Sequence, residues 1–254
     1  MEAPFALGRR LLFGHRGAPL ERPENTIASF RLALELGVNA LESDLHVTRD
    51  GHVMLAHDPD GVRMAGTAAQ IRSSTRTEVE RWDVGVGFTL PDGTRPLAGH
   101  GHRIPSLEDV LAEFPDLPLN LDIKQLAPDP TAALATLLTH AGAVARVLVT
   151  SFHERALRRL RRARYPGPLG LSRTGVLLLL ALPAPLMRRV APAAAAQLPD
   201  RLARPTLINR AHAAGMRVDI FTVNELDRAR ALFALGVDGV MTDDPRCVAT
   251  ALHR

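Results

Sequence analysis

Few residues in this chain can form disulfides, thiolate metal sites or aromatic stacks. Cys247 is the only cysteine among 254 residues, so neither an intrachain disulfide nor a cysteine-based metal cluster can form. Such cysteine usage fits a reducing compartment. One tryptophan and one tyrosine leave little aromatic surface for stacking on bases, and we therefore expect no nucleic-acid partner. Lysine is equally scarce, since Lys124 is the only lysine among the 31 lysines and arginines.

Long hydrophobic runs are also absent. The most apolar segment, residues 176–182, is followed by Pro183 and Pro185 and falls far short of the roughly 20 residues of a membrane span. Residues 1–10 hold no apolar stretch of the length found in secretory signals. The sequence therefore predicts no stable membrane insertion and, by default, a cytoplasmic protein. For residues 174–190 a proline-broken helix is the favoured interpretation, and a contact with a partner or a lipid is the alternative.

What is present is the composition of a globular protein. Hydrophobic residues make up 46% and charged residues 23%, which excludes a disordered chain and a fibrous repeat. The length suits one large α/β domain that buries enough surface to need no disulfide. The net charge is only +4, although six arginines cluster between residues 155 and 164. Their spacing predicts a solvated helix face, and binding to an anionic surface is the less favoured interpretation.

Short apolar runs alternate with amphipathic helical segments along most of the chain. Eight of these runs are predicted strands, centred on Leu11, Ala40, Leu119, Val147, Leu169, Ala194, Val218 and Gly239. Alternating strands and helices indicate parallel pairing, and eight such units favour a closed (β/α)8 TIM barrel of the α/β class. An open doubly wound sheet stays possible, although no G-x-G-x-x-G motif follows the first strand. Residues 58–105 lack the pattern and are predicted to be a small insertion after the second strand, a face or lid over a site. The whole of residues 1–254 would then be one domain.

Active sites of such barrels lie at the carboxyl ends of the strands. The sequence places these side chains there: His15, Arg16, Glu42, Asp44, His57, Asp122 and Lys124. Because Lys124 is kept in a chain that otherwise uses arginine, it suggests a site that needs a compact positive charge. Taken singly, each histidine is more often structural than catalytic, and the acids could simply neutralise arginines. Ser151, Asn224 and Asp243 also follow strands, and we expect them to cap the next helices.

Taken together, these side chains predict a phosphate site. Glu42 and Asp44, two residues apart, lie on one face of a strand. With Asp122 they form an all-oxygen set of the kind that Mg²⁺ or Ca²⁺ prefers. Next to Arg16 and Lys124, such a cation would make a pocket suited to phosphate. Two histidines flanking that phosphate could act as general base and general acid, which predicts phosphodiester cleavage.

Eight short motifs occur along the chain. They are GHRG (residues 14–17), PENT (23–26), LESDL (41–45), HD (57–58), IPSL (104–107), NLDIK (120–124), FTVN (221–224) and GVDGVMTD (236–243). In this order they resemble the glycerophosphodiester phosphodiesterase family over nearly the whole chain. The resemblance implies a TIM barrel with a small insertion after the second strand. It also implies metal-dependent hydrolysis of a small-molecule glycerophosphodiester to an alcohol and glycerol 3-phosphate.

By motif match, the resemblance also assigns a role to each candidate residue. It implies that the acid/base pair is His15 and His57, and that the ligands of Mg²⁺ or Ca²⁺ are Glu42, Asp44 and Asp122. The phosphate-binding groups would be Arg16 and Lys124. Phe221 would form a wall of the glycerol pocket, where the family often has tryptophan, and Glu24 would support the first histidine block.

One residue departs from the family pattern. The third metal carboxylate is usually glutamate, whereas this chain has Asp122. The missing methylene withdraws the oxygens by roughly 1.5 Å, which predicts weaker or water-mediated metal binding. Two other activities compete with the main expectation: lysophospholipase D-type cleavage of lysophospholipids, and a barrel that binds phosphate esters without turnover. The sequence leaves four points open: the alcohol released, the choice between Mg²⁺ and Ca²⁺, cyclic-phosphate formation against direct water attack, and the oligomeric state.

Overall fold

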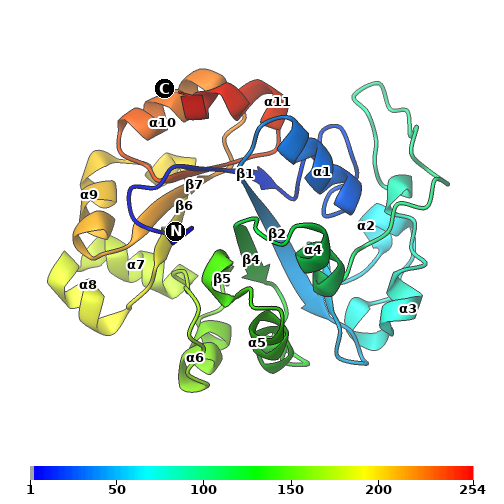
Figure 1. The fold of residues 1–254 in the computed structure, drawn as a ribbon, viewed down its shortest axis with the longest axis horizontal. Coiled ribbons are helices and arrows are strands. Elements are labelled where there is room, and N and C mark those ends of the chain that lie inside the picture. Colours follow the sequence, from blue (N-terminus) through cyan, green and yellow to red (C-terminus); the bar gives the residue numbers. More distant parts are fainter. Residues whose placement is uncertain (1–2, 254) are drawn as a thin grey trace.

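Residues 3–253 are described by the computed structural model, and their parallel strands curl into a ring with helices around it (Figure 1). Seven of the described strands are parallel and pair in the order β5-β4-β2-β1-β8-β7-β6. They are β1 (Leu11–His15), β2 (Ala40–Val47), β4 (Leu119–Ile123), β5 (Val147–Thr150), β6 (Ala195–Pro199), β7 (Arg217–Phe221) and β8 (Gly239–Thr242).

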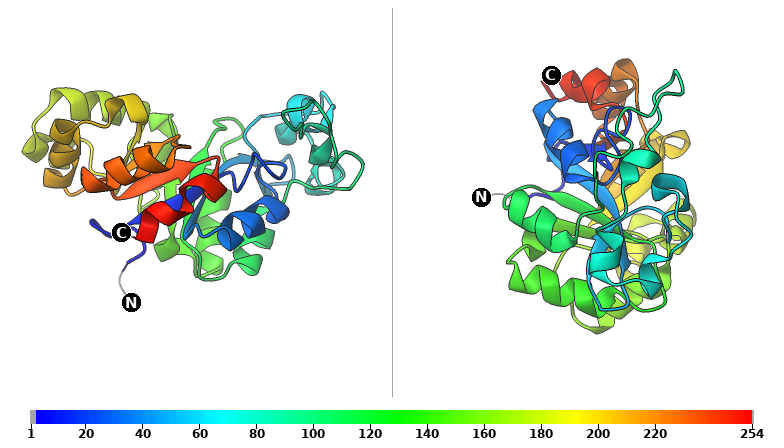
Figure 2. Two further views of the ribbon diagram at one scale, coloured as in Figure 1. Left: turned by 90° about the horizontal axis from the view of Figure 1, so that it is seen from above. Right: turned by 90° about the vertical axis from the view of Figure 1, so that its right-hand side faces the viewer.

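Helices follow the strands along the chain and cover the outside of the sheet (Figures 1 and 2). The α-helices of this layer are α1 (Ile27–Glu35), α4 (Leu107–Glu113), α5 (Thr131–His140), α6 (Glu154–Arg162), α7 (Arg173–Ala181), α8 (Ala184–Val190), α9 (Pro205–Ala213), α10 (Leu226–Ala234) and α11 (Pro245–Val248). Three 3₁₀ turns accompany them, η3 (Val144–Arg146), η4 (Asp200–Leu202) and η5 (Ala249–His253). None of the described helices combines the length and hydrophobicity of a membrane span.

The eighth predicted strand, around Leu169, forms only two isolated bridges. Leu169 pairs in parallel with Val149 of β5, and Gly170 pairs in parallel with Ala195 of β6. The segment is too short for a ladder because prolines remove backbone donors on its amino-terminal side. Gly170 is needed there, since an added Cβ would lie 2.7 Å from the Thr150 side chain. These bridges join β5 to β6, so the (β/α)8 TIM barrel is closed.

Alternate residues of each strand serve two different cores. On β1, Leu11 and Phe13 pack inside the barrel, whereas Leu12 packs between the strands and the helices. Successive strand residues point to opposite faces, so every second residue enters the barrel. The next residue in the inward set of β1 is His15, at its carboxyl end. The alternation that fills the core therefore also delivers side chains to the mouth of the barrel.

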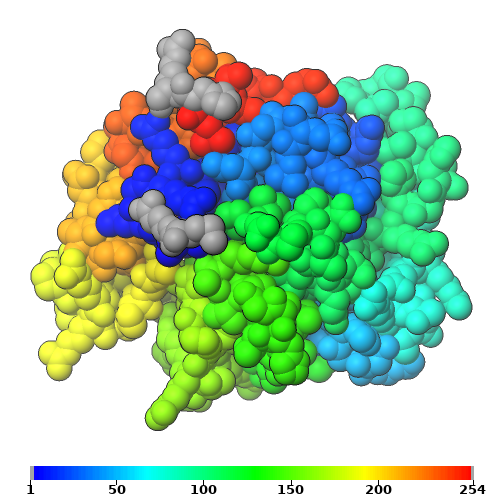
Figure 3. All heavy atoms as spheres, in the orientation of Figure 1, coloured from blue at the N-terminus to red at the C-terminus, as the bar shows by residue number. Residues whose placement is uncertain are grey.

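The N-terminal segment covers the amino-terminal end of the barrel, and a buried ion pair lies beneath it. The Phe5 ring lies over the guanidinium of Arg217, 5.7 Å from centroid to Cζ, and the Ala6 carbonyl accepts a hydrogen bond from the same group. Arg217 forms a fully buried ion pair with Asp219. The dark blue N-terminal segment covers part of this face in Figure 3. The opposite end of the barrel is the end that holds the site.

Residues 58–105 lie at one edge of the barrel (Figure 2, cyan). They follow β3 (Val53–Leu55), which pairs antiparallel with β2, and contain α2 (Val62–Ala65), η1 (Ile71–Ser73), α3 (Arg76–Val79) and η2 (Val84–Val86). A small apolar cluster that includes Met54, Ile71, Val79 and Val84 packs this segment onto β3. After it, α4 begins at a capping box, with Ser106 Oγ accepting from the Asp109 backbone and the Asp109 side chain accepting from the Ser106 backbone.

The apolar stretch after residue 172 forms two helices. α7 ends at Ala181, Leu182 is extended, and Pro183 is the N-cap of α8. Pro185 lies in the first turn of α8, where a missing backbone donor costs nothing. The expectation of a proline-broken helix is therefore confirmed.

Candidate active site

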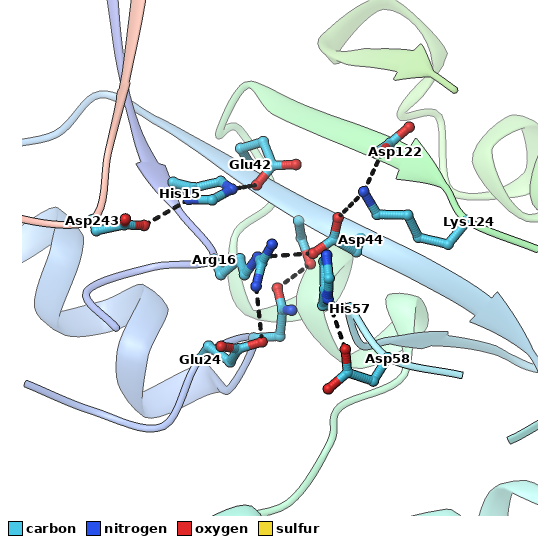
Figure 4. Close-up of polar contacts among 12 residues, drawn as sticks. His15, Arg16, Glu24, Glu42, Asp44, His57, Asp58, Asp122, Lys124 and Asp243 are labelled. Carbon is cyan, nitrogen blue, oxygen red and sulfur yellow. Dashed lines mark hydrogen bonds and ion pairs between the residues drawn. The ribbon is translucent and has the colours of Figure 1, made fainter. Parts of the chain in front are cut away.

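A pocket of about 310 Å³ opens at the carboxyl ends of the parallel strands. Its lining includes eight of the nine predicted site residues, namely His15, Arg16, Glu42, Asp44, His57, Asp122, Lys124 and Phe221. The ninth, Glu24, lies behind Arg16 and contacts it (Figure 4). The close-up shows side chains of β1, β2 and β4 turned toward one another. The predicted residues therefore converge on one site.

The register of neighbouring strands brings the acidic residues together. On β2, Glu42 and Asp44 point inward and are 5% and 1% exposed. Asp44 is the register partner of Asp122 on β4, and Glu42 is the partner of His15 on β1. Paired strands lie about 4.8 Å apart, so partners on the inward face are neighbours. Three carboxylates and one imidazole from three strands thus share one part of the barrel mouth.

The GHRG motif (residues 14–17) forms the turn after β1. Gly17 has φ of 94°, and an added Cβ would lie 2.4 Å from Ser29 Oγ, so only glycine fits there. Arg16 itself has φ of 61°, a conformation that is costly for an L residue. It is held there by a hydrogen bond from its backbone N–H to the Glu42 carbonyl. This strained turn places a guanidinium directly beside the acids of β2.

His15 is held by Asp243, a carboxylate that was expected to cap the last helix. Its Nδ1 lies 2.6 Å from Asp243 Oδ1, while its Nε2 lies 3.7 Å from Glu42 Oε2. Burial alone would lower the pKa of His15, but Glu42 and the Asp243 hydrogen bond outweigh burial and raise the pKa above 6.5. A carboxylate on Nδ1 favours the tautomer with its proton there, which leaves Nε2 for proton exchange.

The predicted helix caps after β7 and β8 are wrong. Asp244, not Asp243, caps α11 by accepting from the Cys247 backbone. Asn224 does not cap α10 but accepts hydrogen bonds from the Asp243 backbone and from Thr242 Oγ1. The signal for Asp243 was available in the strand period, because it continues the inward-facing set of β8. Asn224 therefore holds the backbone that carries the partner of His15.

Ser151 is not a helix cap either. The N-cap of α6 is His153, which makes no side-chain capping bond. Ser151 Oγ instead donates to the Ile123 carbonyl at 2.7 Å and accepts from the His153 backbone at 3.1 Å. It thereby ties the ends of β4 and β5 together beneath the pocket wall.

His57 has a similar arrangement on the other side of β2. Its Nδ1 lies 2.8 Å from Asp58 Oδ1, and Asp58 Oδ2 accepts a 2.6 Å hydrogen bond from Arg63 Nε. Burial would raise the pKa of Asp58, but the hydrogen bonds from His57 and Arg63 outweigh it and lower that pKa. Arg63 also binds Glu24, which contacts Arg16 at 3.2 Å. Glu24 therefore links Arg16 to the insertion and does not touch the first histidine itself.

Arg16 and Lys124, two of the cations that line the pocket, contact its acids. Lys124 Nζ is 2.9 Å from Asp44 Oδ1 and 2.5 Å from Asp122 Oδ2. Arg16 Nε is 3.1 Å from Asp44 Oδ2, although the pair lacks the geometry of a hydrogen bond. Asp44 is thus neutralised from both sides. Among residues 3–253, only His15 lies within ion-pair distance of Glu42.

Burial and these charges separate the acids by their affinity for a proton. Burial raises the pKa of Glu42 to about 8, and the neighbouring Asp44 charge adds to the rise. Burial also raises the pKa of Asp122, in spite of Lys124. Burial would raise the pKa of Asp44 too, but Lys124 and Arg16 outweigh it and lower that pKa. Groups pushed in opposite directions within one pocket are typical of functional sites.

The donor set fits a hard divalent cation. Glu42 Oε2, Asp44 Oδ2 and Asp122 Oδ1 are all buried without a hydrogen-bond partner. Buried oxygens of this kind are costly unless a ligand completes them. Within residues 3–253, no three His, Cys, Asp or Glu side chains are already gathered as a metal shell, because Lys124 lies between two of the acids. The chemistry therefore fits the ion, and Lys124 competes with it for the same oxygens.

The opposite wall of the pocket is more apolar. Phe221 and Phe152 line it and pack edge to face, with centroids 6.5 Å apart. Lys124 Nζ lies 5.2 Å from the Phe152 centroid, a cation–π distance. Leu171 and Val176 line the same pocket. One side of the pocket thus suits charge, and the other suits a carbon chain.

A closed parallel barrel with histidines, cations and unpartnered carboxylates at its carboxyl end has the architecture of the (β/α)8 enzymes, whose active sites lie at that end. Residues 15–247 match the glycerophosphoryl diester phosphodiesterase family. The chain belongs to that family.

Individual relatives match this chain over most of their length. The chain is 33% identical to a probable glycerophosphodiester phosphodiesterase 2 from Mycobacterium tuberculosis, over 93% of this chain and 88% of the relative. It is 26% identical to lysophospholipase D GDPD1 from Homo sapiens, over 94% and 85% of the two chains. A solved phosphodiesterase from Oleispira antarctica, in complex with the product sn-glycerol-3-phosphate, matches with a TM-score of 0.78. That structural match has 23% identity and covers 97% of this chain and 98% of the other.

Proposed function

We propose that the protein hydrolyses glycerophosphodiesters to an alcohol and glycerol 3-phosphate. Family membership supports this, and one observation carries the chemistry: two histidines line a single pocket together with Arg16 and Lys124, each histidine with its Nδ1 on an aspartate. Each aspartate orders the histidine tautomer and stabilises an imidazolium as it forms. The two Nε2 atoms are then the groups that exchange protons with the substrate.

The reaction needs two proton transfers. One of His15 and His57 removes a proton from the attacking hydroxyl or water. The other gives a proton to the oxygen of the departing alcohol, which would otherwise leave as a strong base. Arg16 and Lys124 hold the phosphate and offset the charge that builds on its oxygens. Phe221 and its neighbours cover the glycerol carbons.

We also propose that Glu42, Asp44 and Asp122 hold a divalent cation, Mg²⁺ or Ca²⁺. The support is their three buried, unpartnered oxygens. When bound, such an ion would polarise a phosphoryl oxygen and stabilise the developing negative charge. The phosphate would take Lys124 as its partner, which would release Asp44 and Asp122 for the ion. Asp122 is shorter than the glutamate usual in the family, so this ligand is expected to bind weakly or through water.

A coupled assay for glycerol 3-phosphate tests the activity. The purified protein is incubated with a panel of glycerophosphodiesters, with EDTA or with added Mg²⁺ or Ca²⁺. Release of glycerol 3-phosphate that stops with EDTA and returns with either ion is the expected result. Turnover that ignores the chelator would contradict the metal assignment alone. Binding of glycerol 3-phosphate without turnover of any diester would favour the non-catalytic barrel.

The apolar wall favours one second candidate, lysophospholipase D-type cleavage. Leu171, Val176 and Phe152 could accompany the first carbons of an acyl chain out of the pocket. The same enzyme preparation, given lysophosphatidylcholine, would then release choline. Faster turnover of this substrate than of glycerophosphocholine would establish the second candidate, and no choline release would dismiss it.

A further inference from the structure

Positive charge is concentrated in one segment of the chain. Residues 152–190 contain nine arginines and a single acidic residue, Glu154, a formal charge of +8. The whole chain carries only +4, so the remainder is acidic. The segment comprises α6, α7 and α8, which pack in succession along one side of the barrel (Figure 1). We refer to the exposed residues of this segment as the α6–α8 surface.

The same segment exposes large apolar side chains. Nine large hydrophobic residues are exposed among those that the structure describes, and five of them lie here. They are Phe152 at 53%, Leu177 at 60%, Leu180 at 44%, Leu186 at 40% and Val190 at 49% exposed. Monomeric proteins rarely gather exposed apolar residues without a purpose. The coincidence of the basic and the apolar residues is the feature that needs an explanation.

Helical spacing aligns these residues into stripes. Arg173, Leu177 and Leu180 are three and four residues apart on α7 and share one exposed face. On α8, Leu186 and Val190 are four residues apart and share another. α7 and α8 contact each other and both contact α9, which buries the opposite faces. Leucines on these outward faces therefore contribute nothing to the core.

Many of the arginines have no acidic partner. Arg158 and Arg161 pair with Glu154, and Arg159 pairs with Asp129. Five others are exposed and make no ion pair or side-chain hydrogen bond among residues 3–253: Arg155, Arg162, Arg164, Arg173 and Arg189. Unpaired charges of one sign on one surface attract a partner of the opposite sign.

A surface hollow joins the arginines of α6 to the start of α7. Its volume is about 520 Å³, and it is lined by Arg155, Arg158, Arg159 and Arg162, with Glu154 and Thr174. Guanidinium groups around a hollow of this size suit a phosphate group. In Figure 3 the yellow-green and yellow atoms of the segment project from the body of the protein.

The α6–α8 surface also reaches the mouth of the active-site pocket. Phe152, Arg173 and Val176 line that pocket and belong to the same segment. Leu177 and Leu180 continue outward from Val176 along α7. A flat partner seated on these leucines would therefore lie beside the entrance to the site.

We propose that the α6–α8 surface docks the protein on an anionic lipid surface. Leucine and valine side chains enter the boundary between headgroups and acyl chains, and the unpaired arginines contact lipid phosphates. Helices that lie in a membrane interface combine these two features, an apolar stripe with arginines beside it. The docking goes beyond the proposed function, because it does not depend on which diester is cleaved. It would hold the pocket entrance at the membrane.

Vesicle co-sedimentation tests the proposal. The probes are vesicles of phosphatidylcholine alone and vesicles in which about one third of the lipid is phosphatidylglycerol, a fraction high enough for the arginines to sense. Wild-type protein should sediment with the anionic vesicles and stay in solution with the neutral ones. High salt should weaken the binding, since it screens the arginine contacts.

Two double variants separate the apolar and the basic contributions. Leu177→Ser with Leu180→Ser should weaken partitioning by roughly tenfold, because it removes apolar contact with the bilayer. Arg155→Gln with Arg162→Gln should weaken it by roughly 25-fold, at about fivefold for each arginine. Matched controls are Leu235→Ser and Arg95→Gln, exposed residues outside the segment that should leave partitioning unchanged. All variants should keep the wild-type melting temperature, which confirms that they are folded, and the wild-type turnover of a water-soluble glycerophosphodiester.

Four outcomes would overturn the proposal. The proposal is wrong if the wild-type protein does not bind anionic vesicles. It is also wrong if the leucine variants bind these vesicles as well as the wild type does. A concentration-dependent dimer that the leucine variants abolish, without vesicle binding, would assign the surface to a second copy of the chain. Tight binding of a single-stranded oligonucleotide in place of vesicles would assign the arginines to nucleic acid. None of these results depends on whether the proposed hydrolysis is correct.

Discussion

The two ends of the barrel bury charge in different ways. At the amino-terminal end, Arg217 and Asp219 are 0% exposed, and every polar atom of both side chains has a partner. At the carboxyl end, Glu42, Asp44 and Asp122 each keep one buried oxygen without a hydrogen bond. Both ends pay the desolvation cost of burying charge. Only at the carboxyl end do buried oxygens lack a hydrogen bond within the protein that would compensate for this desolvation.

This contrast separates a structural ion pair from a functional site. A closed network makes a barrel end rigid and needs nothing further. An incomplete network can bind a ligand that completes it, and we propose a cation and a phosphate as those ligands. Mutations at the two ends should therefore act on different measurements.

The largest effect is expected from the histidines of the carboxyl end. His15→Ala and His57→Ala should each lower kcat by roughly 10²–10⁴-fold, because each removes a proton-transfer group. The melting temperature should change little. The glycerol 3-phosphate assay and thermal unfolding measure the two quantities. His140→Ala, on an outer helix, serves as the matched control. Normal kcat in either folded variant would remove that histidine from the mechanism.

Substitutions at the amino-terminal end of the barrel should lower stability and leave activity unchanged. Asp219→Ala leaves Arg217 buried and unpaired, which should lower the free energy of unfolding by about 3–5 kcal/mol. Denaturant unfolding measures this loss, and kcat of the folded fraction should stay at the wild-type value. Arg217→Met combined with Asp219→Leu should lose less than the single variant, because no charge is left without a partner. Equal losses would show that packing, and not the ion pair, matters there.

A smaller effect on activity is expected from Asp243, which acts through His15. Asp243→Asn should lower kcat by roughly 10–100-fold, with little change in KM, because it no longer orders the Nδ1 proton. Asp244→Asn is the control, since it alters only the cap of α11 and should cost at most about 1 kcal/mol of stability. If both variants lose kcat equally, the His15–Asp243 contact has no special role.

The smallest effect concerns the short metal ligand. Asp122→Glu should tighten binding of Mg²⁺ or Ca²⁺ by several-fold, because the longer side chain brings its oxygen closer to the ion. Calorimetric titration of the metal alone measures this. Glu42→Gln, which removes a charged ligand, should weaken binding in the same assay. Unchanged or weaker affinity of Asp122→Glu would contradict the geometric argument.

Local patterns were sufficient to predict the barrel and most of its site. Short apolar runs located seven of the eight strands, and the seven side chains placed at the mouth of the barrel on that basis all line the pocket. The prediction failed at Leu169, where glycine and proline leave room for only two bridges. It also failed at Asn224 and Asp243. Both are common capping residues, and capping was the local explanation. In the structure, Asp243 contacts His15 and Asn224 contacts the Asp243 backbone, and neither residue caps a helix.

The sequence by itself determined which side chains enter the barrel, because a strand period of two is a local property of the backbone. Only the tertiary structure decided that Asp243 holds His15, 228 residues away. That contact exists because β8 pairs with β1 in the sheet, although the two strands lie at opposite ends of the chain. The exposure of the leucines on α7 was likewise a tertiary result, because it depends on which helix faces α9 leaves uncovered.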